Sequence, residues 1–157
     1  MNTAIDATEL VTLLRTRGET ICVAESLTGG GLAHVITAVA GASDVFRGGV
    51  IAYSSDVKRD VLKVSQELMD THTVVSQEVA IAMAHGAKTL TGATWAIATT
   101  GVAGPGPNGG HRAGTVWIAI EGPSHHSTQL AIDGTREVVR NATIASAIST
   151  LTRILST

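Results

Sequence analysis

The chain has 157 residues, 3% of them aromatic, and a formal net charge of −2 with charges of both signs mixed along its length. This is the length of one domain, and the lack of a basic stripe argues against a nucleic-acid or membrane surface. The single cysteine, Cys22, excludes an internal disulfide bond and fits a reducing compartment, and no apolar run approaches the ~20 residues that span a bilayer. The first residues lack the basic and apolar regions of a signal peptide, so we expect one cytoplasmic domain over residues 1–157.

Helical and β patterns alternate along the chain. Asp6, with Glu9 three residues later, is typical of a helix start, and Ser55, Ser65 and Ser76 are predicted N-caps of three further helices. The predicted elements are a helix from Asp6 to about Gly18, a strand at 20–24, a helix at 28–40, a strand at 48–54, short helices at 55–62 and 65–72, a helix at 77–90, strands at 94–99, 114–121 and 127–132, and a final helix from 134.

The order of these elements predicts the fold class. Strands and helices alternate and then two strands follow each other, which favours an α/β domain of three layers, α/β/α. Its mixed sheet of about five strands is expected to be mostly parallel with one antiparallel strand. Ligands of such sheets bind beyond the carboxyl ends of the strands, so the polar or glycine-rich segments 25–31, 54–58 and 99–114 should converge on one site.

The first of these segments reads Ala24-Glu-Ser-Leu-Thr-Gly-Gly-Gly31. Ser26 or Thr28 could be the N-cap of the following helix, and the spacing alone favours this interpretation. Alternatively, the turn presents the Ser26 hydroxyl beside free backbone N–H groups that could bind an oxyanion. The G-x-S-x-G pattern of a nucleophile elbow is absent, so a general base would have to come from another segment.

The second segment, Ser55-Asp-Val-Lys58, matches S-x-x-K, in which a lysine of lowered pKa can activate a serine. The companion motifs K-T-G and S-D-N are missing, because Leu90 follows Lys88-Thr89 and Val45 follows Ser43-Asp44. This segment alone therefore favours Ser55 as a helix cap and Lys58 as a solvated residue.

The loop from Gly101 to Gly114 holds six glycines and two prolines and can approach a ligand closely. Its G-x-G-x-x-G match is not a dinucleotide fingerprint, because a strand rather than a helix follows it. Arg136 and Arg140 lie on one face near a predicted helix start and could bind an anion or pair with nearby carboxylates. The six histidines show no metal-ligand spacing, so we expect no metal.

Taken together and in this order, these segments resemble the CinA C-terminal domain family, the nicotinamide-nucleotide amidases. The segments that carry the resemblance are Ala24-Glu-Ser-Leu-Thr-Gly-Gly30, Tyr53-Ser-x-x-x-Lys58, Val75-Ser76, Gly101-Val-Ala-Gly-Pro105, Gly114-Thr-Val-Trp117 and Gly134-x-Arg-x-x-Val-Arg140. Two features depart from the family pattern: Ser55 stands where the family usually has Asn, and the loop at 107–113 lacks the more common Gly-rich stretch ending in Lys-Pro.

The resemblance implies a three-layer fold and hydrolysis of the carboxamide of nicotinamide mononucleotide to nicotinic acid mononucleotide and ammonia, in pyridine nucleotide salvage. It implies a catalytic Ser26, Tyr53 and Lys58, with Tyr53 relaying a proton or orienting the groups, and no cofactor. The implied substrate-binding residues are Leu27, Thr28, Gly29, Gly30, Thr100, Gly101, Val102, Ala103, Gly104, Arg136 and Arg140. The expected partners are a small nucleotide and further copies of the chain, as a homo-oligomer, with neither nucleic acid nor membrane. The alternatives are a serine amidase for another small amide and a non-catalytic nucleotide-binding module.

Overall fold

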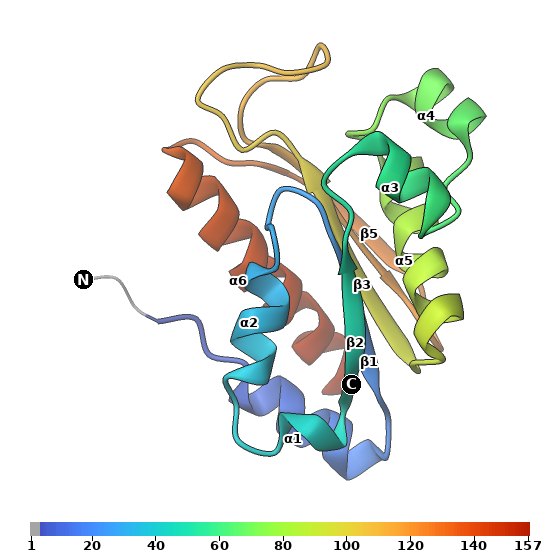
Figure 1. Cartoon of the computed structure of the whole chain (residues 1–157). Helices are drawn as coiled ribbons and strands as arrows, with labels where there is room; N and C mark the ends of the chain where they lie inside the picture. Colours follow the sequence, from blue (N-terminus) through green and yellow to red (C-terminus); the bar gives the residue numbers. More distant parts are fainter. Residues whose placement is uncertain (1–3) are drawn as a thin grey trace.

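Helices cover both faces of a central sheet in the computed structural model, which describes residues 4–157 (Figure 1). The layers form a single α/β domain, as the sequence predicted. The elements are α1 (Thr8–Arg17), β1 (Ile21–Glu25), α2 (Gly31–Thr37), the 3₁₀ helix η1 (Ala42–Asp44), β2 (Phe46–Ile51), α3 (Ser55–Asp60), α4 (Gln66–His72), α5 (Gln77–Thr91), β3 (Trp95–Gly101), β4 (Thr115–Glu121), β5 (His126–Ala131) and α6 (Arg136–Leu155).

The five-stranded sheet has the order β2-β1-β3-β4-β5. β1 pairs in parallel with β2 and β3, while β4 runs antiparallel to both β3 and β5. Four strands therefore point one way and β4 points the other, which confirms the predicted mixed sheet. The interior strand β1 is buried along its whole length, because helices cover both of its faces.

Each face of the sheet has its own hydrophobic core. Ile21 and Val23 pack with α1, α2 and α6, whereas Cys22 and Ala24 pack with α5 and the segments around α3 and α4. This division follows from the strand geometry, in which successive side chains point to opposite faces. Cys22 is a buried core residue, and its burial raises the pKa of the thiol.

Several predicted helix starts are confirmed and others are wrong. Ser65 and Ser76 cap α4 and α5. Their hydroxyl groups accept hydrogen bonds from the backbone amides of Leu68 and Val79, respectively. Ser55 is instead the first residue of α3, and Ser54 occupies its N-cap position without a capping hydrogen bond. The helix predicted at 28–40 is shorter at both ends, because α2 begins only after a turn in which Gly29 and Gly30 have positive φ.

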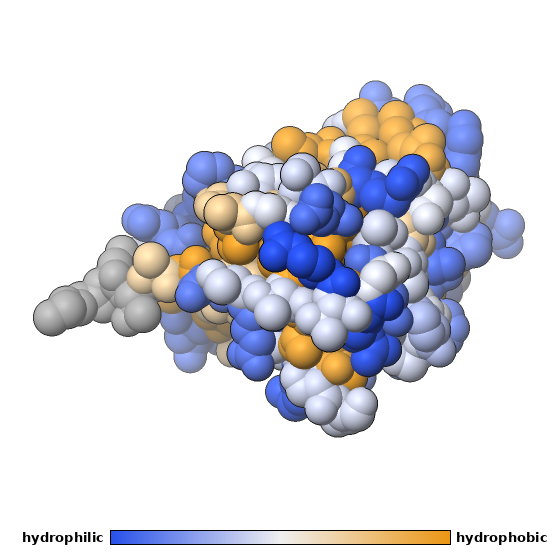
Figure 2. Space-filling view, turned by 90° about the horizontal axis from the view of Figure 1, so that it is seen from below, coloured by the Kyte–Doolittle hydropathy of each residue, from blue (hydrophilic) through white to orange (hydrophobic). Residues whose placement is uncertain are grey.

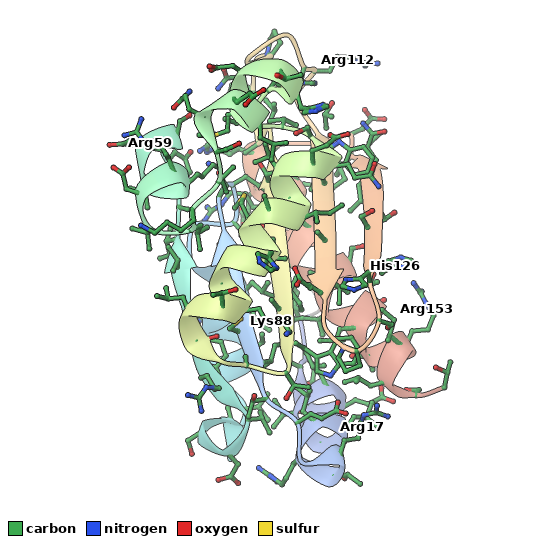
Figure 3. All side chains as sticks on the ribbon, turned by 90° about the vertical axis from the view of Figure 1, so that its right-hand side faces the viewer. Arg17, Arg59, Lys88, Arg112, His126 and Arg153 are labelled. Carbon is green, nitrogen blue, oxygen red and sulfur yellow. The ribbon has the colours of Figure 1, made fainter. Side chains whose placement is uncertain are left out.

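Apolar and basic groups are spread out on the sides of the molecule that Figures 2 and 3 show. Within residues 4–157, no helix is long and apolar enough to cross a bilayer. The end of the molecule seen in Figure 2 shows apolar atoms in separate patches between polar ones. The basic side chains labelled in Figure 3 are spread along the length of the molecule, from Arg17 on α1 to Arg112 on the loop before β4.

Candidate active site

The carboxyl ends of the three parallel strands bring the predicted segments together. Ser26 follows β1 directly, the chain after β2 leads through Tyr53 into α3, and β3 runs into the loop that starts at Gly101. The three segments converge on a cavity of about 320 Å³. Its lining comprises Ser26, Leu27, Tyr53, Ser55, Lys58, Thr73, Val74, Val75, the stretch 100–109, His111 and Arg136.

Lys58 and Ser26 meet on the floor of this cavity. The Nζ atom of Lys58 lies 3.0 Å from the Oγ atom of Ser26. Lys58 as a whole is only 2% exposed, because α3 turns this side chain inward. Leu62, just beyond the end of α3, is buried as well. Lys58 is thus not the solvated residue that its own segment suggested. Burial lowers the pKa of its ammonium from 10.5 to about 8.

Two backbone carbonyls determine how a neutral Lys58 amine points. The Nζ atom donates to the carbonyl oxygens of Ala52, at 2.7 Å, and Tyr53, at 3.3 Å. A neutral amine has two N–H donors and one lone pair. When both donors are used on these carbonyls, the lone pair faces the third neighbour, the Ser26 hydroxyl. The arrangement can therefore remove a proton from Ser26.

The turn that carries Ser26 is held by several hydrogen bonds. The Ser26 amide donates to Thr99 O at 3.0 Å, and the hydroxyls of Thr28 and Thr99 lie 2.8 Å apart. Arg140 donates to the carbonyl oxygens of Leu27 and Thr28. Among the described residues, no acceptor pairs with the backbone amides of Leu27 and Thr28.

Tyr53 and Arg136 form part of the cavity rim. The Tyr53 side chain is 59% exposed, and its hydroxyl accepts a hydrogen bond from Arg136 at 2.8 Å. Arg136 also donates to Gly104 O at 2.7 Å, so it bridges α6, the segment after β2 and the glycine-rich loop. Among residues 4–157, neither Lys58 nor Ser26 hydrogen-bonds the Tyr53 hydroxyl.

The structure divides the predicted binding residues into two groups. Those that line the cavity are Leu27, Thr100, Gly101, Val102, Ala103, Gly104 and Arg136, whereas Thr28, Gly29, Gly30 and Arg140 do not. The Arg140 guanidinium lies against the Ser26 turn, where it binds carbonyl oxygens. Its position supports the turn from outside the cavity.

Other residues of the site had no clear signal in the sequence. Thr73 has a φ of 66°, unusual for a β-branched residue, and its hydroxyl lies 2.7 Å from Nε2 of His111 on the glycine-rich loop. Neither Ser26 nor Thr28 caps α2. The buried Glu25 carboxylate instead accepts the amides of Leu32 and Ala33. The described residues contain no group of three or more metal-binding side chains.

Sequence similarity extends over nearly the whole chain. Residues 4–155 match the family model described as the CinA C-terminal domain. A CinA-like protein of Prochlorococcus marinus (strain MIT 9313) is 43% identical over 155 residues, covering 95% of this chain and 36% of that protein. A CinA-like protein of Synechococcus sp. (strain RCC307) is 42% identical over 142 residues, covering 88% of this chain and 34% of that protein. The chain thus spans about a third of the length of these relatives.

Solved structures of similar size share the fold. A competence-damaged protein (CinA) superfamily protein from Klebsiella pneumoniae 700603 superposes with a TM-score of 0.93 and 34% identity, covering 96% of this chain and 95% of that chain. A competence/damage inducible protein from Agrobacterium tumefaciens has a TM-score of 0.91 and 32% identity, with 100% of both chains covered.

The lowered pKa of Lys58 should make stability depend on pH. The folded state releases this proton near pH 8 and the unfolded state near 10.5, so the unfolded state binds more protons between these values and stability rises with pH. At roughly 1.4 kcal/mol per pKa unit, we expect the wild type to gain about 3 kcal/mol of unfolding free energy relative to Lys58→Met between pH 7 and 10.5. Urea denaturation of both proteins at a series of pH values measures this difference.

Lys63→Met, which removes an exposed ammonium, serves as the control. Its unfolding free energy should differ from that of the wild type by the same amount at every pH. Parallel curves for Lys58→Met would contradict the buried amine.

Proposed function

This chain belongs to the CinA C-terminal domain family, and we propose that it hydrolyses the carboxamide of nicotinamide mononucleotide through a Ser26–Lys58 pair. The observation that carries the proposal is the 3.0 Å contact between Lys58 Nζ and Ser26 Oγ on the floor of a cavity. A module that only binds nucleotides has no use for a buried amine of lowered pKa beside a serine. The contact therefore favours catalysis over binding alone.

The reaction proceeds in two halves. Neutral Lys58 takes the Ser26 proton while Oγ attacks the carboxamide carbon, and a tetrahedral oxyanion forms. The C–N bond then breaks, and the proton on Lys58 passes to the leaving nitrogen, which departs as ammonia. Lys58 next takes a proton from water, whose oxygen attacks the acyl-serine ester. The ester bond breaks, Ser26 regains a proton, and the carboxylate product leaves.

A backbone amide of the Ser26 turn is the donor for the oxyanion. The amides of Leu27 and Thr28 are free of partners in the described part of the chain. Leu27 lines the cavity and Thr28 does not, so the Leu27 amide is the donor that a substrate can reach. One such donor contributes about 3 kcal/mol to transition-state stabilisation.

The remaining groups of the cavity suit a nucleotide. Val74, Val75 and Val102 provide an apolar surface for the pyridine ring, and the backbone of the glycine-rich loop can approach the ribose closely. Arg136 is the exposed cation at the rim, and a guanidinium pairs well with a phosphate. Its present acceptors, Tyr53 Oη and Gly104 O, are neutral, so an anionic phosphate competes well with them. We assign Tyr53 the orienting role, because its hydroxyl bonds Arg136 rather than the Ser26–Lys58 pair.

The first test is the release of ammonia from nicotinamide mononucleotide by the purified protein. We expect turnover by the wild type and a loss of at least about 10³-fold in kcat for Ser26→Ala and Lys58→Met, since removing one member of a nucleophile–base pair disables the pair. A coupled ammonia assay measures the rates, and circular dichroism verifies folding. No release by the wild type would refute the proposed substrate, and undiminished release by Ser26→Ala would refute the nucleophile.

The pH dependence tests the base. Only the neutral amine accepts a proton, so kcat/KM should rise about tenfold per pH unit below the Lys58 pKa of about 8 and level off above it. Initial rates from pH 6 to 9.5 at low substrate concentration give this profile. Activity that is independent of pH over this range would exclude Lys58 as the base.

Arg136 should recognise the phosphate group. We expect Arg136→Gln to raise KM for the mononucleotide about tenfold, the equivalent of one charge-assisted hydrogen bond, with kcat nearly unchanged. The same nucleoside without its phosphate should be hydrolysed equally well by both proteins. Arg153→Gln is a matched control, because Figure 3 shows Arg153 near the far end of α6, pointing outward. An equal loss with both substrates would assign Arg136 to loop support instead.

A further inference from the structure

Glu25 is a fully buried carboxylate directly beside the proposed nucleophile. It is the last residue of β1 and is 0% exposed. Ile21 and Val23 point to the face of the sheet that α2 covers, and strand alternation places Glu25 on the same face. Ser26 comes next in the chain and contacts Lys58 on the opposite face. Glu25 thus lies behind the Ser26 turn, away from the cavity, whose lining does not include it.

Both carboxylate oxygens of Glu25 are used on the first turn of α2. One oxygen accepts the Leu32 amide at 2.8 Å and the other accepts the Ala33 amide at 3.0 Å. Such amides are normally satisfied by a Ser, Thr, Asp or Asn side chain at the N-cap. Here the N-cap is Gly30, with a φ of 98° and no side chain. The end of the preceding strand therefore supplies the cap of this helix.

This cap closes the Ser26 turn into a ring. The turn leaves β1 at Glu25 and returns, through Gly29 and Gly30, to amides that the Glu25 side chain holds. Two glycines with positive φ make this stretch flexible by themselves. Arg140 and Thr99 hydrogen-bond Leu27 and Thr28 in the middle of the turn. Glu25, at its start, binds the first turn of α2, at its end. The positions of Ser26 Oγ and of the free Leu27 and Thr28 amides then depend on the Glu25 contact.

We propose that Glu25 is a positioning residue of the active site. From the opposite face of the sheet, it holds the turn so that the Ser26 hydroxyl and the oxyanion donor keep their positions relative to each other. This inference rests on the proposed serine chemistry, but it concerns the turn rather than the identity of the substrate. A side chain that acts in this way changes the rate of the chemical step and leaves substrate binding and the protonation of Lys58 as they are.

The test compares Glu25→Gln with the wild type. Glutamine has the same shape, but its amide NH₂ faces one of the two backbone N–H donors, so one of the two hydrogen bonds is lost. We expect kcat on nicotinamide mononucleotide to fall 10- to 100-fold, with KM within twofold and the midpoint of the pH profile unchanged. Thr94→Ala, which removes the acceptor of the Thr20 amide at the opposite end of the sheet, is the control and should lower the melting temperature without changing kcat. An unchanged kcat in folded Glu25→Gln, or a shifted pH midpoint, would overturn the positioning role.

Two further measurements keep this inference separate from the proposed substrate. A fluorophosphonate reacts covalently with an activated serine, and mass spectrometry of the intact protein measures the labelling rate. This rate reports the reactivity of Ser26 and its oxyanion donor without any amide substrate. Labelling at least tenfold slower in Glu25→Gln supports the inference even if the wild type releases no ammonia, and equal labelling refutes it. If Glu25→Gln does not fold, amide hydrogen exchange in the wild type decides. The Leu32 and Ala33 amides should be protected as strongly as the next turn of α2, and fast exchange would contradict the cap.

Discussion

The burial of one amine, that of Lys58, is the constraint on which the site depends. An ionised lysine removed from water is costly, and three acceptors offset part of that cost: Ser26 Oγ and the carbonyl oxygens of Ala52 and Tyr53. All three are available only where β1 and β2 end side by side and α3 turns back over them. The parallel pairing of β1 with β2 is therefore a requirement of the Ser26–Lys58 contact as well as of the fold. The same burial that destabilises the ammonium makes the amine a competent base near neutral pH.

Local patterns predicted most of the fold, and the errors have physical causes. Ser65 and Ser76 were assigned correctly because an N-cap is a local interaction within four residues. The start of α2 was assigned wrongly, since the chain at Gly29 and Gly30 adopts left-handed backbone that no hydrophobic period reveals. Ser55 was assigned wrongly by one position, because Ser54 occupies the N-cap and a sequence pattern does not fix a helix end to a single residue. The burial of Lys58 arises from tertiary packing. Its own segment reads as a solvated helix. The weak S-x-x-K match paired it with Ser55, and only the family resemblance paired it with Ser26. Contacts between distant segments, such as those of Glu25 with α2 and Thr73 with His111, had no comparable signal.

The two faces of the sheet carry different parts of the site. On the α3 face lie the hydroxyl, the amine and the cavity, which are the groups that would meet a substrate. On the α2 and α6 face lie Glu25 and Arg140, which bind the backbone of the turn without lining the cavity. This division lets charged groups of both signs act on the turn. The sheet separates them from the amine, whose lowered pKa is caused by burial alone.

The floor of the cavity is buried, whereas its rim is exposed to solvent. Ser26 and Lys58 are buried and belong to strand ends and a helix, where neighbouring packing fixes their geometry within the small tolerance that proton transfer demands. Tyr53 and Arg136 are exposed and reach the glycine-rich loop through hydrogen bonds to neutral acceptors, which a charged ligand can replace. A site built in this way separates chemistry from recognition. The departures of this chain from the family pattern, at Ser55 and at 107–113, fall on the cavity wall and the loop and leave the Ser26–Lys58 contact intact. They are thus placed to alter which ligand is held, while the proposed serine chemistry depends on the floor.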